Sequence, residues 1–144
     1  MNITIQGVSI TLTPEQLQQL NTEIERQKAP TKEIRALEVL AAYSMHRTSC
    51  NNQRRRSVKA YAAIIEIIEI LNEGWKPNWL DSNQYKYYPT YRRAESSVFV
   101  YYGSYNWFFR ASVGSFLCFK SPELAEYFGR TFIDLWNDYS PMEL

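Results

Sequence analysis

The chain has 144 residues and a formal net charge of +1, with 16 Lys or Arg against 15 Asp or Glu. This length suits one domain, or one domain with a small arm, and allows a real hydrophobic core. The balanced charge excludes nucleic-acid or membrane binding that rests on overall charge alone. Two cysteines and no signal-peptide pattern predict an intracellular protein of the host cytoplasm with free thiols. Because no apolar run approaches ~18 residues, we expect no membrane partner.

The first segment predicts a β-hairpin followed by a helix. Apolar and polar residues alternate on both sides of Gln6-Gly7, which is typical of two strands joined by a tight turn. Thr13 and Pro14 then indicate a helix start, and Gln16 completes a capping box. We therefore predict a hairpin–helix arm over residues 1–30 and an α+β body over residues 31–144.

The arm buries few apolar side chains, because Leu17, Leu20 and Ile24 lie on one side of an otherwise polar helix. Such a piece is not stable alone. It either packs on the body or forms a homo-oligomer through residues 1–28. Pro30 separates the arm from the main helices and slightly favours the homo-oligomer.

The body is organised around a central helix over residues 58–71. Apolar side chains cover most of its circumference, so we expect other elements to cover it on most sides. It ends near Gly74, which suits a left-handed capping position. Before it, a helix runs from Thr31 to about His46. Its predicted apolar face consists of Ile34, Leu37, Leu40, Ala41 and Met45.

The aromatic second half predicts four strands, over residues 85–91, 98–102, 105–110 and 116–119, with a turn at Gly103-Ser104. A last helix begins after Ser121 and carries Gly129 at its middle, where glycine is unfavourable unless close packing requires it. We therefore predict an α+β fold. In it, an antiparallel four-stranded sheet packs on the central helix and the C-terminal helix, with the N-terminal β-hairpin–helix arm beside them.

Four segments of the second half resemble a module found in small proteins of gut Bacteroidetes, their phages and mobile elements. The segments are LNEGWKPNW at 71–79, YKYYP at 85–89, GSFLCFKSPELAEYFG at 114–129 and FIDLW at 132–136. The arm is not part of this resemblance. The resemblance implies a biological setting but no activity, and it transfers no functional residues.

Catalytic and metal-binding patterns are weak. His46 is the only histidine and lies four residues from Cys50, which with Cys118 gives fewer ligands than a zinc site needs. One stripe of the central helix carries Glu66, Glu69 and Glu73. Such a stripe is typical of the solvent-exposed side of an otherwise buried helix. No phosphate-binding glycine-rich loop occurs. We therefore predict no catalytic residues, no metal and no cofactor.

Binding patterns are stronger. Arg54, Arg55 and Arg56 stand before a predicted helix start, where they form either an anion site or a solvated basic linker. The strands mix aromatic and basic residues, and one strand face could stack on nucleic-acid bases, bind a protein, or fill the core. The candidate binding residues there are Tyr85, Tyr87, Arg92, Arg93, Tyr101 and Tyr105.

These patterns favour a non-enzymatic accessory binding protein of a phage or mobile element. In one version the basic and aromatic surface contacts nucleic acid, which the interleaving of the two residue types favours. In the other the chain is a protein–protein interaction module, such as an inhibitor of a host defence system or a virion component. The balanced charge favours this second version, in which the partner is a host or phage protein. An enzyme of an unfamiliar kind is the third class.

Overall fold

The computed structural model describes residues 2–5, 8–11, 13–28, 30–94, 98–107 and 117–140. The chain separates into two compact units, Met1–Thr31 and Lys32–Leu144. In the first unit, β1 (Asn2–Ile5) pairs antiparallel with β2 (Val8–Thr11), and α1 (Pro14–Lys28) follows. Thr13 N–H donates to Gln16 Oε1 at 3.0 Å, and Gln16 N–H donates to Thr13 Oγ1 at 3.2 Å. The predicted capping box is therefore confirmed.

The second unit begins with two long helices, α2 (Lys32–Arg47) and α3 (Gln53–Asn72). α3 is the predicted central helix, but it starts five residues earlier than expected. It does so because Asn52 caps it, accepting a 3.1 Å hydrogen bond from Arg55 N–H through its side-chain oxygen. The arginine run therefore lies in the first turn of α3. At the other end Glu73 and Gly74 both have positive φ, 51° and 81°.

The predicted four-stranded sheet is wrong. The described part of the second unit holds one antiparallel pair, β3 (Lys86–Arg93) and β4 (Phe99–Trp107). β4 runs straight through the predicted turn at Gly103-Ser104. Gly103 instead pairs with Thr90, whose hydroxyl donates to the Gly103 carbonyl at 2.9 Å, next to a shift in register. Glycine inside a strand often marks such a bulge.

The remaining predicted strands also change. Residues 105–107 complete β4, while residues 108–110 and 116 lie outside the described residues. Of the fourth predicted strand, Phe119 makes only an isolated bridge to Tyr87, with N–H···O bonds of 2.9 and 3.0 Å. Asn72 holds this segment from the end of α3. Its side chain donates to the Cys118 carbonyl at 2.8 Å and accepts from Lys120 N–H at 3.1 Å.

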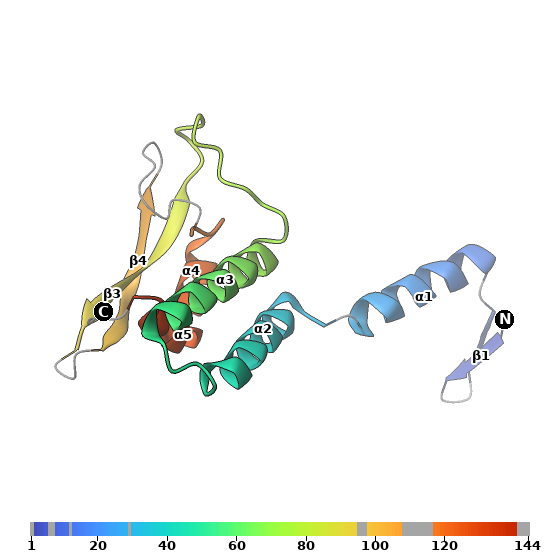
Figure 1. Ribbon diagram of the computed structural model, residues 1–144. Helices are drawn as coiled ribbons and strands as arrows, with labels where there is room; N and C mark the ends of the chain where they lie inside the picture. Colours follow the sequence, from blue (N-terminus) through green and yellow to red (C-terminus); the bar gives the residue numbers. More distant parts are fainter. Residues whose placement is uncertain are drawn as a thin grey trace. The chain divides into compact units, whose positions relative to one another are not determined.

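The C-terminal helix is divided in two, α4 (Pro122–Thr131) and α5 (Ile133–Tyr139), by the fully buried Phe132. The β3–β4 hairpin packs mainly on these two helices, so the expectation that the sheet packs on the central helix is wrong. α5 lies between the hairpin and α3, and α2 covers another side of α3 (Figure 1).

The core joins α3 to its neighbours. Its fully buried members include Ile64 and Ile67 of α3, Phe132, and Leu135 of α5. α2 contributes Ala36 and Tyr43 instead of most of its predicted apolar face. Ile34, Leu37 and Met45 are exposed, Met45 to 80%. α2 therefore carries a second apolar stripe that is exposed in the described structure. None of the helices in the described ranges is long and apolar enough to cross a lipid bilayer.

Gly129 brings α4 close to the hairpin. A Cβ atom built at this position would lie 2.6 Å from Tyr101 Cε2 and 2.9 Å from Pro89 Cβ, both too close. We expect Gly129→Ala to lower the free energy of unfolding by about 1–3 kcal/mol through overpacking, although alanine favours helix. Urea melts give this value. The control is Gly103→Ala, where the new Cβ meets its nearest atom at 3.7 Å. Equal stability of the Gly129→Ala protein and the wild type would refute the close packing.

Candidate nucleic-acid interface on the hairpin

The strand register fixes which side chains share a face of the hairpin. Tyr91 pairs with Tyr101, and Arg92 pairs with Val100. The Tyr91 ring stacks on Trp136 of α5, with ring centroids 4.4 Å apart, so this side faces the helices. Because successive side chains in a strand point to opposite sides, Arg92 lies on the outer side.

Four residues form what we call the outer aromatic face: Arg92, Tyr102, Tyr105 and Trp107. The register passes from Thr90–Gly103 to Tyr91–Tyr101, so Tyr102 is the extra residue of a bulge. The Arg92 guanidinium carbon lies 5.7 Å from the centroid of the Tyr102 ring. The Tyr105 and Trp107 rings meet edge to face at 6.1 Å. The exposed fractions of Tyr102, Tyr105 and Trp107 are 70%, 59% and 39%.

The charges on the two strands of the hairpin have one sign, and the segment that connects the strands contains Glu95. Residues 86–93 and 99–107 contain Lys86, Arg92 and Arg93 but no Asp or Glu. Lys86 is fully buried, its ammonium donating to the Asp81 carbonyl at 3.0 Å and lying 5.3 Å from the Trp79 ring centroid. Arg92 and Arg93 are exposed. The surface charge of the described hairpin therefore comes from the two arginines at its closed end.

Tyr88 and Cys118 lie next to Tyr105 of the outer aromatic face. Tyr88 pairs with Tyr105 across the strands and is half-buried, and burial raises its pKa. Burial also raises the pKa of the Cys118 thiol to about 11, although a hydrogen bond with Tyr88 and the charge of Lys86 act in the opposite direction. Both groups are therefore neutral at physiological pH. A protonated, buried thiol is a poor nucleophile, so these groups support the face without adding chemistry.

Three of the predicted binding tyrosines lie away from this face. Tyr87 is half-buried against the core, and the exposed Tyr85 precedes β3 with its ring 6.4 Å from that of Tyr87. Tyr101 is half-buried beside Gly129, and the Arg130 guanidinium lies 4.8 Å from its ring centroid. The structure therefore groups only Arg92 and Tyr105 of the predicted set on the outer side.

The predicted arginine run lies in the first turn of α3. Arg54 and Arg55 are exposed, whereas Arg56 is half-buried and donates to the Cys50 carbonyl at 2.9 Å. α3 packs mainly on α2 and α5, while the hairpin packs mainly on α4 and α5. Both surfaces adjoin the end of α5, because Ser57 of α3 donates to the Tyr139 carbonyl at 2.6 Å and Asn137 Nδ2 donates to the Phe99 carbonyl at 3.0 Å. Among the described residues, no hydrogen bond or ion pair links the arginine run to the outer aromatic face.

The candidate catalytic and metal-binding residues do not come together in the described structure. His46 is exposed, and Cys50 is buried with its thiol 3.6 Å from the Asn52 carbonyl. Glu66 and Glu69 are exposed, and Glu73 pairs with Lys120 at 2.9 Å and Lys32 at 3.1 Å. These hydrogen bonds, that of Lys120 first, lower the pKa of Glu73. Within the described ranges, no group of three or more His, Cys, Asp or Glu side chains is placed to hold a metal ion.

Tyr102 and Trp107 were missing from the predicted site. Trp107 had a usable signal, because it stands two residues after Tyr105 and so shares its side of a strand. Tyr102 also had one, because alternation places it on the side of the strand opposite Tyr101. The bulge instead places Tyr105 and Trp107 on the same side as Tyr102.

Comparisons with profiles of known protein families, with curated proteins and with solved structures found no match to this chain. The outer aromatic face is therefore judged by its own geometry and chemistry.

Proposed function

We propose that this chain is a non-enzymatic accessory protein of a phage or mobile element that binds single-stranded nucleic acid inside the host cell. The outer aromatic face is the proposed contact. The observation that carries the proposal is the exposure of three aromatic rings on one side of a hairpin, with an arginine and no carboxylate on the described strands. The resemblance of residues 71–79, 85–89, 114–129 and 132–136 to a module of phages and mobile elements supports the setting.

Single strands fit this face better than a duplex. Unpaired bases offer their flat sides to aromatic rings, and such stacking tolerates any sequence. The exposed Tyr102, Tyr105 and Trp107 offer rings for this purpose. Arg92, beside Tyr102, supplies a charge for a phosphate or for cation–π contact with a base. With a net charge of only +1, we expect stacking to contribute more than electrostatics.

We expect Tyr105→Ala to weaken binding of a labelled single strand of about 10 nucleotides by roughly 5- to 100-fold, since one stacked base is lost. Fluorescence anisotropy at low salt gives the dissociation constants. Arg92→Ala should weaken binding and reduce the salt slope by about 0.7, the value for one phosphate contact on a single strand.

The matched control for Arg92→Ala is Arg55→Ala, which removes the same charge from an exposed position on α3. It should leave affinity and salt slope unchanged. The opposite pattern, with Arg55 needed and Arg92 and Tyr105 dispensable, would move the interface to α3. A wild-type chain that binds neither DNA nor RNA single strands at low salt would refute the proposal.

A protein–protein interaction module is the second candidate function. The observation in its favour is the exposed apolar stripe of α2, with Ile34, Leu37 and Met45 on one side of the helix. Large exposed apolar groups in a row are typical of protein-binding surfaces. In this version a host or phage protein covers the stripe. Leu37→Asp with Met45→Asp should then abolish co-purification of that protein while leaving single-strand binding unchanged.

A further inference from the structure

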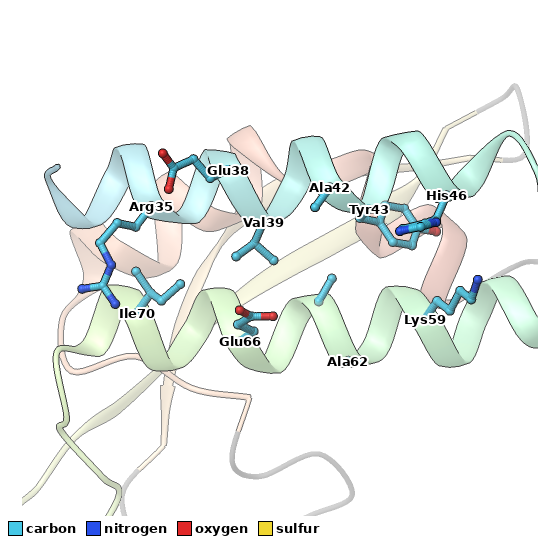
Figure 2. A pocket seen from close by; sticks show the side chains of 11 residues that line it. Arg35, Glu38, Val39, Ala42, Tyr43, His46, Lys59, Ala62, Glu66 and Ile70 are labelled. Carbon is cyan, nitrogen blue, oxygen red and sulfur yellow. The ribbon is translucent and has the colours of Figure 1, made fainter.

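α2 and α3 run antiparallel and leave a groove of about 680 Å³ between them (Figure 2). Its floor is apolar and includes Val39, Ala63 and Ile70. Ala42 and Ala62 line it at the middle, one from each helix. The groove exists because alanines stand where larger side chains would fill the space between the helices.

The ionisable residues along the groove are unevenly distributed. Glu38 of α2 and Glu66 of α3 lie in one half, and His46 and Lys59 lie in the other, with the alanines between them (Figure 2). Arg35 lies beyond Glu38 at the outer end. All five side chains are exposed. Among the described residues, no hydrogen bond or ion pair holds any of these side chains. The half with Glu38, Glu66 and Arg35 thus has a formal charge of −1, and the half with Lys59 and the neutral His46 has a formal charge of +1.

We infer that a second copy of this chain docks on the groove, face to face, about a two-fold axis. Two orientations of this axis are available. An axis parallel to the helices would place acidic half on acidic half, which is repulsive. An axis that crosses the helices places each acidic half on the basic half of the other copy, so the surface is complementary to itself. Charge therefore selects the crossing axis.

The sequence positions agree with this axis on both helices. If Glu66 pairs with Lys59 of the partner subunit, the two-fold axis crosses α3 midway between these residues, between Ala62 and Ala63. If Glu38 pairs with His46 of the partner subunit, the axis crosses α2 at Ala42. Figure 2 shows Ala42 and Ala62 at the same level along the groove, so one axis satisfies both helices. Alanine at the axis lets the paired helices approach closely, and Arg35 then faces the neutral Ser49 of the partner subunit.

The dimer leaves the outer aromatic face uncovered. The hairpin packs mainly on α4 and α5, whereas the groove lies between α2 and α3. Two copies would therefore carry two outer aromatic faces, and the dimer does not depend on what those faces bind.

The test is a charge exchange on α3 of the full chain. At tens of micromolar and low salt, light scattering should give the wild type twice the 17.0 kDa of one chain. Lys59→Glu places a glutamate against Glu66 at two symmetric positions and should weaken the dimer at least roughly tenfold. Glu66→Lys should do the same. The double variant, Lys59→Glu with Glu66→Lys, restores opposite charges and should recover the dimer to within roughly threefold of wild type.

The control is Glu69→Lys, which makes the same charge change on α3 outside the groove and should leave the dimer intact. Because all these positions are exposed, thermal melts should show unchanged folding. A monomeric wild type would overturn the proposal. So would a dimer that none of the groove variants affects, or a double variant weaker than both single ones.

Discussion

Replacing Asp138 by alanine should lower the free energy of unfolding by about 2–4 kcal/mol. Asp138 is buried in α5 and joins that helix to α2. It accepts hydrogen bonds from the Tyr43 hydroxyl at 2.9 Å and from Arg47 Nη2 at 3.2 Å. Alanine would leave the buried hydroxyl of Tyr43 without a partner, while Arg47, whose side chain is 46% exposed, can turn to water. Urea melts at neutral pH measure the loss.

Asp138→Asn is the matched variant, because its amide oxygen can still accept from Tyr43 while the charge is lost. It should cost about half as much as alanine. Burial and, next, the hydrogen bond to Asp138 raise the pKa of Tyr43, so its hydroxyl is neutral throughout these melts. An alanine variant within about 0.5 kcal/mol of wild type, the range of ordinary surface substitutions, would show that Asp138 does not hold α5 to α2.

Ile67→Ala should cost about 2–5 kcal/mol, the usual range for deleting a fully buried isoleucine side chain. Ile67 is 0% exposed on α3, the helix that contacts both α2 and α5. Denaturant melts compare it with Ile65→Ala, a neighbouring isoleucine that is only half-buried. We expect Ile65→Ala to cost less than half as much. Equal costs at the two positions would mean that α3 is packed differently from this description.

Sequence patterns predicted where the helices occur, but not the division of the last one at Phe132. The capping signals at Thr13 and Ser121 are local, because each cap depends on residues within one turn. The side of α2 that packs on the core was predicted incorrectly. Its largest apolar residues, among them Leu37 and Met45, are exposed, while Ala36 and Tyr43 are buried. α2 is apolar on two sides, and hydrophobicity alone does not tell which side a neighbouring helix will cover.

The sheet was mispredicted because a glycine such as Gly103 is compatible with two structures. Glycine permits turns, but it also occurs at bulges inside strands, and the choice depends on its partner Thr90 across the hairpin. The exposed tyrosines of the binding face were hard to predict for a similar reason. Alternation separated two sets of residues on β4, yet tyrosines occur in both, with Tyr101 inside and Tyr102 outside. Only the position of Gly129 and α4 against Tyr101 decides between them.

The most direct test of the central claim is ultraviolet cross-linking of the wild-type chain to a single strand, followed by peptide mass spectrometry. Aromatic rings stacked on bases cross-link efficiently, so the method reports which residues touch nucleic acid. The account predicts cross-links at Tyr102, Tyr105 or Trp107, the exposed rings of the outer aromatic face. Cross-links confined to the α3 peptide that carries Arg54 and Arg55, or none at all, would contradict it.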